Sequence, residues 1–252
     1  MGIETLAIGI YLAVINIVAF VAFGLDKRRA KREEWRIPER TLLVLAFLGG
    51  GLGAVLGMLA FRHKTRKLRF RILVPIALVL SLLVGGGALY YSDYYHADGT
   101  AVATTTSTES VEVHAIGGGC IAFIPQDPVA GMVFYPGAKV EAMAYAPLMR
   151  LCAEQGVLCV LVQPPLNFAL LSINAAQGAM AQFPQVDTWI VAGHSLGGVA
   201  ASQYASENPD AVDALVFLAS YPAADLSGFA GSTLSIVGTE DGVLNREAYA
   251  DG

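Results

Sequence analysis

The chain has 252 residues and a net charge of −5, and 55% of its residues are hydrophobic. This length allows one large domain or two small ones. The charges are unevenly distributed: residues 26–71 contain thirteen of the sixteen Lys and Arg, whereas residues 72–252 contain three basic and sixteen acidic side chains. This division excludes a single domain of even charge and indicates that only one part of the chain faces an anionic surface.

Three apolar stretches near the N-terminus account for the high hydrophobicity. Residues 6–24, 41–61 and 72–91 contain no Asp, Glu, Lys or Arg. Each is about 20 residues long, enough for a helix to cross a hydrocarbon core of about 30 Å. A cleavable signal peptide fits poorly, because the positive cluster follows the first stretch instead of preceding it. We therefore predict a domain of about three transmembrane helices in residues 1–95, located in a cytoplasmic membrane.

The topology of the second stretch is ambiguous. Basic clusters lie on both sides of it, in residues 27–40 and 62–71, and the positive-inside rule places both in the cytoplasm. Either the stretch re-enters, bending at its three consecutive glycines, or it spans the membrane and one loop breaks the rule. Gly49, Gly53 and Gly57 recur every four residues, which on a continuous helix makes a smooth ridge for close packing. This repeat slightly favours a full span.

The third stretch has a basic flank before it and an acidic sequence after it. This asymmetry places the residues after Tyr95 outside the cytoplasm, and four tyrosines at 90, 91, 94 and 95 are typical of a membrane interface. Membrane insertion and anionic lipid headgroups explain the basic loops. We expect membrane lipid as a partner and no nucleic acid.

The rest of the chain has the pattern of an α/β domain. Residues 96–110 are small and polar without apolar periodicity, which predicts a linker. From residue 111 to 252, apolar runs of strand length alternate with helical patterns, which favours a largely parallel sheet. The predicted strands are 111–116, 120–124, 131–135, 157–162, 189–192, 214–219 and 233–237, and the predicted helices are 141–155, 172–183 and one beginning at 199.

The pentapeptide Gly193-His194-Ser195-Leu196-Gly197 lies between a predicted buried strand and a predicted helix. A serine hydroxyl is a weak nucleophile at neutral pH and needs an exposed, strained turn where a histidine can take its proton. Glycines two positions before and after the serine let the strand and the helix pass closely. The motif therefore predicts a nucleophile turn, the alternative being an ordinary strand-to-helix turn.

The sequence predicts no metal and no cofactor. Cys120 and Cys159 fall on predicted buried strands and Cys152 on a helix, which is typical of small packing residues. His, Cys and carboxylate residues show no metal-ligand spacing. The glycine runs lack the Gly-Lys-Ser/Thr ending of a phosphate-binding loop.

Two parts of the chain resemble known families. Phe134–Val140, Gly193–Gly198 and Gly238–Gly242 resemble segments of membrane-anchored bacterial α/β-hydrolases of the dienelactone-hydrolase-like group. Residues 6–75 resemble a bacterial membrane domain of unknown function (family 1294). The motifs that carry this second resemblance are Asp26–Lys31, Trp35–Arg40 and Phe61–Lys67. The resemblance implies an α/β-hydrolase fold after a bundle of transmembrane helices.

The hydrolase resemblance also implies roles for individual residues. Ser195 matches the nucleophile. The backbone N–H of Leu196, with that of Gly137 or Ala138 after the strand 131–135, matches the oxyanion hole.

The acid that orients the histidine matches Asp241, just after the last predicted strand. Asp225 and Glu240 are alternatives, and Asp241 could instead stabilise a turn before Gly242. The fold order is Ser, Asp, His, yet no histidine follows Ser195.

None of the four histidines occupies the expected position. His194 lies inside the nucleophile turn, His63 flanks a membrane stretch, and His96 and His114 precede the core of the sheet. We therefore expect a chain that lacks its last strand and histidine and is inactive in this form, the alternative being a natural pseudo-enzyme.

Two functions follow from these observations. The first is a membrane-anchored serine hydrolase that acts on an ester or similar acyl compound outside the cytoplasm. The second is a non-catalytic membrane protein whose hydrolase-like domain binds or scaffolds. We expect residues 164–168 to line the pocket and to favour an apolar group, while the short segment 221–232 disfavours a large lid.

Overall fold

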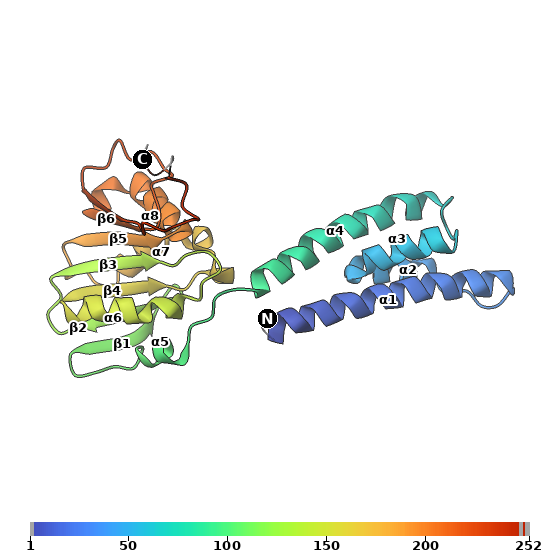
Figure 1. The fold of residues 1–252 in the computed structure, drawn as a ribbon, viewed down its shortest axis with the longest axis horizontal. Helices are drawn as coiled ribbons and strands as arrows, with labels where there is room; N and C mark the ends of the chain where they lie inside the picture. The colour runs from blue at the N-terminus through green and yellow to red at the C-terminus, as the bar shows by residue number, and fades with distance from the viewer. Residues whose placement is uncertain (1–2, 247–248, 250–252) are drawn as a thin grey trace. The chain divides into compact units, whose positions relative to one another are not determined.

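The computed structural model describes residues 3–246 and 249 and divides the chain into two compact units, Met1–Asp93 and Tyr94–Gly252 (Figure 1). The first unit is helical. Its elements are α1 (Ile3–Lys31), α2 (Glu39–Leu45), a π-helical turn (Ala46–Gly50), α3 (Gly51–Ala60) and α4 (Leu68–Ser92). Three helical segments are long and apolar enough to cross a membrane, Thr5–Lys31, Glu39–Ala60 and Leu68–Ser92. They contain the three apolar stretches of the sequence, apart from Phe61.

The second of these segments is broken at its glycines. Leu48 (φ −77°, ψ 15°) and Gly49 (φ 104°, ψ −4°) leave the helical conformation, and glycine adopts such a positive φ at little cost. The Tyr11 hydroxyl in the middle of α1 donates to the Leu48 carbonyl at 2.7 Å. Glu39, the first residue of the segment, accepts from Lys64, which lies four residues beyond its last residue, at 3.0 Å. The two ends of the segment therefore lie together, and α2 and α3 form a helical hairpin with Leu48 and Gly49 at its tip.

Asn16 of α1 holds the tip of this hairpin. Its side-chain amide donates to the Gly49 carbonyl at 2.9 Å and accepts from the Gly53 N–H at 2.8 Å. A Cβ on Gly53 would lie 2.0 Å from the Asn16 carbonyl oxygen, and one on Gly57 would lie 2.8 Å from the Phe23 Cβ. The glycine repeat thus brings α3 against α1. The continuous helix that this repeat slightly favoured is wrong, because Gly49 reverses the chain.

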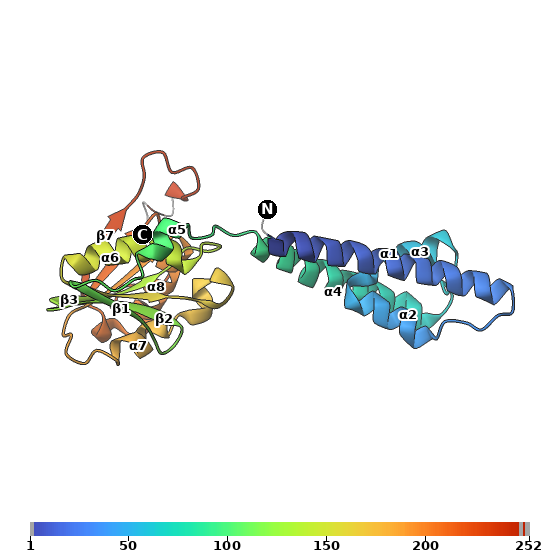
Figure 2. The ribbon, with the colours of Figure 1, turned by 90° about the horizontal axis from the view of Figure 1, so that it is seen from below.

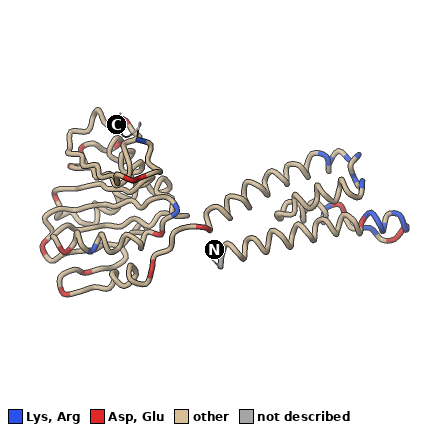
Figure 3. The backbone as a smooth tube through the Cα atoms, viewed as in Figure 1, with Lys and Arg blue, Asp and Glu red and all other residues tan. Residues whose placement is uncertain are grey.

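The connections at one end of the helical unit meet at a buried carboxylate. Asp26 accepts from the Ile37 N–H at 3.0 Å, and its other oxygen lies 2.7 Å from His63 Nε2 and 3.2 Å from Lys64 Nζ. Figure 3 shows the Lys and Arg of this unit gathered at that end. At the opposite end the Thr5 hydroxyl donates to the Ser92 carbonyl at 3.1 Å. The two basic loops are therefore on one side of the unit.

The second unit is built on a seven-stranded sheet of order β1-β2-β4-β3-β5-β6-β7. The β1–β2 and β2–β4 pairs are antiparallel and the other pairs are parallel. The strands are β1 (Val111–Ile116), β2 (Cys120–Pro125), β3 (Ala130–Tyr135), β4 (Val157–Val162), β5 (Trp189–His194), β6 (Ala214–Leu218) and β7 (Ser232–Ile236). Each predicted strand is present within two residues of its predicted ends.

Helices cover both faces of the sheet (Figure 2). They are α5 (Gly99–Ala103), α6 (Ala146–Glu154), α7 (Ala175–Met180) and α8 (Leu196–Glu207), with short 3-10 segments at Ala142–Tyr145, Pro165–Asn167, Ala169–Ser172 and Pro209–Ala211. The alternating residues of β3 divide between two cores: Phe134 packs with Met149 of α6, whereas Tyr135 packs with Tyr204 of α8. This αβα arrangement is the predicted fold class.

Residues 96–110, predicted as a linker, belong to the second unit and are more ordered than their composition predicts. Asp98 caps α5 by accepting from the Ala101 N–H at 2.7 Å. The buried Arg150 of α6 donates to the Thr104 carbonyl at 2.7 Å and to the Thr108 hydroxyl at 3.2 Å. The small polar residues of this segment have no apolar periodicity that would predict this order. The order comes from the Asp98 cap and from the hydrogen bonds with Arg150 of α6.

Candidate functional site

Ser195 lies at the turn between β5 and α8. Its backbone has φ 50° and ψ −121°, a region that costs an L-residue of order 1–3 kcal/mol and persists only where the surroundings enforce it. Here the Ser195 N–H donates to the Leu218 carbonyl at 2.9 Å, and the Ser220 hydroxyl donates to the Ser195 carbonyl at 2.7 Å. Both bonds tie the turn to the end of β6 and hold it in this conformation.

The glycines of the motif permit the close approach of three segments. A Cβ on Gly193 would lie 2.2 Å from the Gly197 carbonyl carbon, and a Cβ on Gly197 would lie 2.1 Å from the Tyr135 carbonyl oxygen. A Cβ on Gly198 would lie 2.3 Å from the Ser220 hydroxyl. Side chains at these positions would push α8 away from the sheet, so the glycine spacing has the physical basis expected from the sequence.

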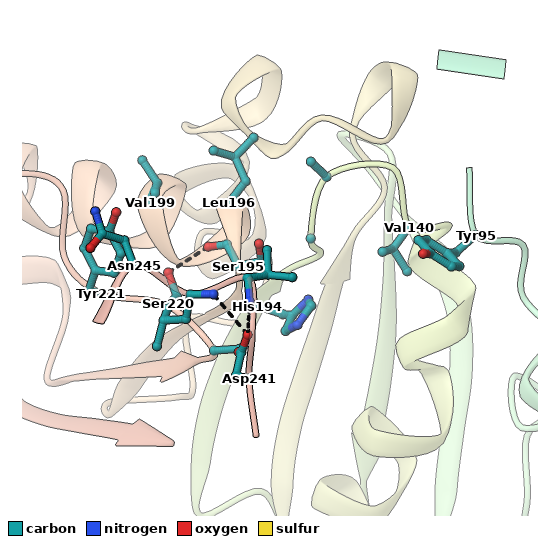
Figure 4. A pocket seen from close by; sticks show the side chains of 15 residues that line it. Tyr95, Val140, His194, Ser195, Leu196, Val199, Ser220, Tyr221, Asp241 and Asn245 are labelled. Carbon is teal, nitrogen blue, oxygen red and sulfur yellow. Dashed lines mark hydrogen bonds between the residues drawn. The ribbon is translucent and has the colours of Figure 1, made fainter. Parts of the chain in front are cut away.

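A cavity of about 580 Å³ opens over the carboxyl ends of β3, β5 and β6 (Figure 4). Of the residues predicted to form the site, Gly137, Ala138, His194, Ser195, Leu196 and Asp241 line it, whereas Asp225 and Glu240 do not. The carboxyl ends of parallel strands are where α/β proteins bind ligands. These six residues thus share one pocket, while Gly193 and Gly197 of the turn are not among its lining residues.

The backbone amides of the predicted oxyanion hole differ in their partners. The Gly137 N–H donates to the Tyr145 hydroxyl at 3.1 Å. Leu196 is the first residue of α8, and a first helical N–H has no acceptor within its own helix. Within residues 3–246 and 249, no hydrogen bond uses the Leu196 or Ala138 N–H as donor. These two amides are available to a ligand in the cavity.

The Tyr145 hydroxyl also engages His194, because it lies 2.8 Å from His194 Nδ1. The pKa of His194 is lowered by burial, and the Asp241 carboxylate opposes this shift in part. A neutral ring can accept a hydrogen bond from the Tyr145 hydroxyl at Nδ1, while the same hydroxyl oxygen accepts from the Gly137 N–H. His194 is thus engaged through Nδ1 with the Tyr145 hydroxyl.

Asp241 combines a place in the cavity with a turn-forming role. One carboxylate oxygen accepts from the Val243 N–H at 2.9 Å and from the Leu244 N–H at 3.0 Å. These bonds, with Leu244 first, hold the pKa of Asp241 below its ordinary value. The carboxylate is therefore ionised at neutral pH and fixed at the pocket wall.

The other histidines have partners elsewhere. His96 Nδ1 lies 3.7 Å from Glu141, and His114 Nδ1 lies 3.3 Å from Glu112 on β1. His63 belongs to the helical unit. Within the described residues no group of three or more His, Cys, Asp or Glu side chains is placed to hold a metal ion.

Two family models match this chain. The model described as "Alpha/beta hydrolase family" matches residues 131–251, and the model "Protein of unknown function (DUF1294)" matches residues 16–70. The uncharacterized protein YsdA of Bacillus subtilis is 42% identical over 87 residues, which are 34% of this chain and 96% of YsdA. The chain belongs to the DUF1294 family and carries an α/β-hydrolase domain.

Solved structures similar to the chain include three hydrolases. A carboxyl esterase from Bacillus coagulans is 12% identical (45% of this chain, 46% of that chain, TM-score 0.37). A bacterial heroin esterase is 17% identical (49% and 49%, TM-score 0.40), and an epoxide hydrolase mutant from Solanum tuberosum is 20% identical (44% and 40%, TM-score 0.36). The chain spans about half the length of these proteins.

Three pocket features of the hydrolase domain were not predicted. Ser220 supports the Ser195 turn, Tyr145 connects Gly137 to His194, and Tyr95 lines the cavity from the segment after α4. Of these three residues, only Ser220 could have been found from the sequence. It directly follows the predicted strand 214–219, and the end of that strand lies beside the nucleophile turn. The prediction that residues 164–168 line the pocket is wrong: they are not among its lining residues. Asn167 instead accepts the Lys139 N–H at 3.0 Å and supports the loop after β3.

Proposed function

We propose that the α/β-hydrolase domain is a serine hydrolase that acts on an ester or similar acyl compound, with Ser195 as nucleophile. The observation that carries the proposal is the strained turn that presents Ser195 to the cavity, beside the available N–H groups of Leu196 and Ala138. A ligand carbonyl between the hydroxyl and these two amides would be set for acyl transfer.

In this reaction the Ser195 oxygen attacks the ester carbonyl carbon, and the carbonyl oxygen becomes an oxyanion. The Leu196 and Ala138 amides stabilise that charge, and removal of one such donor typically costs about 2.7–4 kcal/mol of barrier. The hydroxyl proton needs a base, and Asp241 is the carboxylate we propose to orient it. The base passes this proton to the departing alkoxide, which leaves as the alcohol while the acyl–serine ester forms, and water then cleaves this ester to the carboxylic acid and free Ser195.

We propose that none of the four histidines serves as this base, since His194 Nδ1 is engaged with the Tyr145 hydroxyl and the other histidines do not line the cavity. Without a base, the oxyanion donors and binding alone typically leave about 10³–10⁴-fold catalysis over water. We therefore expect slow acylation of Ser195 that an external base accelerates.

The helical unit supports a membrane-anchored hydrolase. We propose that α1 and α4 cross the membrane and that the α2–α3 hairpin enters and leaves on the side of the basic loops. The positive-inside rule then places these loops in the cytoplasm and the end at Ser92, with the hydrolase domain, outside.

A fluorophosphonate probe tests the nucleophile directly. We expect slow labelling of the full chain in detergent, mapped to Ser195 by mass spectrometry and accelerated by added imidazole. Ser195→Ala should remove the labelling, whereas the control Ser227→Ala, at an exposed serine outside the cavity, should not. Label on another residue, or equal labelling of Ser195→Ala, would contradict the proposal.

A second candidate function is binding without catalysis. The bond between His194 and Tyr145 favours it, because it commits the one histidine that lines the pocket. This function predicts that Ser195 stays unlabelled even with imidazole, although a ligand still occupies the cavity.

A further inference from the structure

The cavity at Ser195 has a wall made by the segment that directly follows the last membrane-capable helix. The Tyr95 N–H donates to the Lys139 carbonyl at 2.8 Å, and the Glu141 N–H donates to the Tyr95 carbonyl at 2.9 Å. The Glu141 carboxylate accepts from the Ala97 N–H at 2.8 Å. These bonds attach residues 95–97 to the loop after β3 that carries Ala138. Figure 4 shows Tyr95 beside Val140 at the edge of the pocket.

The connection between this wall and the membrane-capable helix is short. Only Asp93 and Tyr94 separate Ser92, the last residue of α4, from Tyr95. Three Cα–Cα steps span at most about 11 Å. The Cα atom of Tyr95 therefore lies within about 11 Å of the last residue of α4, whatever the orientation of the hydrolase domain.

The pocket rim is apolar and exposed. Val243 is 94% exposed and Tyr95 is 76% exposed, and both line the cavity. Val140, Val199 and Leu244 continue the apolar lining toward Ser195. Exposed apolar side chains around a pocket are typical of a site for an apolar or membrane-bound ligand.

The charges of the domain disfavour an anionic ligand. Asp241 is the one Lys, Arg, Asp or Glu among the described lining residues. Residues 94–252 hold three basic and fifteen acidic side chains, so their net field repels anions. A ligand that approaches along this rim is therefore favoured when it carries no negative charge.

We propose that the pocket takes an uncharged single-chain acyl ester from the membrane interface, with its chain along the apolar wall and its ester at Ser195. This inference rests on the proposed function and names its substrate class. Residues 95–97, which follow α4 in the sequence, act as part of the binding site.

Photo-crosslinking tests the substrate class without catalysis. The full chain is placed in phosphatidylcholine vesicles with a hexadecyl glycerol ether that carries a diazirine in its chain and cannot be hydrolysed. We expect crosslinks on the peptides that contain Tyr95 or Val243. A probe with a phosphate in place of the glycerol should label these peptides about tenfold less, corresponding to about 1.4 kcal/mol.

Matched variants separate the pocket from the rest of the surface. Val243→Asp adds a charge at the rim and should lower the crosslinking yield about threefold, whereas Val129→Asp should not, because Val129 is 77% exposed and lies outside the cavity. Both positions are exposed, so folding should tolerate both changes. Val199→Trp, which fills the cavity, should reduce the yield further.

The short connection between α4 and Tyr95 has its own test. A 30-residue Gly/Ser insertion between Asp93 and Tyr94 should lower labelling by the vesicle-bound probe several-fold, because the effective concentration of the pocket at the surface falls. Labelling by a soluble short-chain diazirine ether should not change.

Crosslinks confined to α1 and α4, equal labelling by the phosphate probe, or full labelling of Val243→Asp would overturn the inference. Failure of Ser195 to react with fluorophosphonate while these crosslinks persist would overturn only the proposed hydrolase reaction.

Discussion

At the residue scale, the nucleophile turn depends on the absence of side chains at a few positions. Gly193 and Gly197 lie where a Cβ would overlap backbone atoms that cannot move independently of the sheet. Ser195 takes a positive φ that its two supporting hydrogen bonds enforce. The site therefore combines local strain with tight packing.

This packing predicts opposite effects for two glycine substitutions. Gly197→Ala should destabilise the hydrolase domain by about 2 kcal/mol or more, because its Cβ meets the Tyr135 carbonyl and overpacking costs this much. Gly178→Ala, in α7 with open space around it, should stabilise by about 0.5–1 kcal/mol. Urea unfolding followed by Trp189 fluorescence in a Trp35→Phe background measures both. A neutral Gly197→Ala would contradict the packing argument.

His194 predicts a pH dependence of stability. Its pKa is lowered by burial in the folded state, so below its ordinary value of about 6.5 the unfolded chain binds the proton more readily. Stability should therefore fall as the pH decreases below about 6.5. Thermal unfolding between pH 7.5 and 5 should show a shallower decline for His194→Gln than for wild type. An unchanged slope in His194→Gln would be the contrary result.

At the element scale, the tip of the α2–α3 hairpin is held by the side chain of one residue, Asn16. Asn16 satisfies a carbonyl and an N–H at the break in the helix, and such groups find no partner in lipid. Both of these bonds join Asn16 to residues more than thirty positions away.

We predict that Asn16→Leu destabilises the helical unit by about 1–3 kcal/mol for each group left unpaired. Unfolding in mixed micelles by increasing dodecyl sulfate measures this loss. Ile10→Leu, at an exposed position of α1, serves as control and should leave the midpoint unchanged. If Asn16→Leu behaved like this control, the proposed role of Asn16 at the tip would be wrong.

At the scale of the whole molecule, the hairpin removes the conflict between the two basic loops. Residues on both loops contact Asp26 at one end of the helical unit. In the topology we propose, both loops therefore stay cytoplasmic while α1 and α4 cross, and the hydrolase domain follows on the opposite side.

Cysteine accessibility tests this topology. In a chain with its three native cysteines replaced by alanine, Thr100→Cys should react with an impermeant maleimide in intact cells. Arg36→Cys and Thr65→Cys should react only after permeabilisation, as the positive-inside rule requires. If Thr65→Cys reacted in intact cells while Arg36→Cys did not, Glu39–Ala60 would instead span the membrane.

The sequence by itself determined the features that depend on local pattern. The length of the apolar stretches predicted the membrane-capable segments. Short apolar runs that alternate with helical patterns predicted the strands, and the glycine spacing predicted the turn at Ser195. Each of these features is set by residues that are neighbours in the sequence. Only the tertiary structure decided the reversal at Gly49, the order around Arg150, the Tyr145–His194 pair and the Tyr95 wall. Each of these depends on hydrogen bonds between residues at least thirty positions apart, and no local pattern encodes which distant partners the fold brings together.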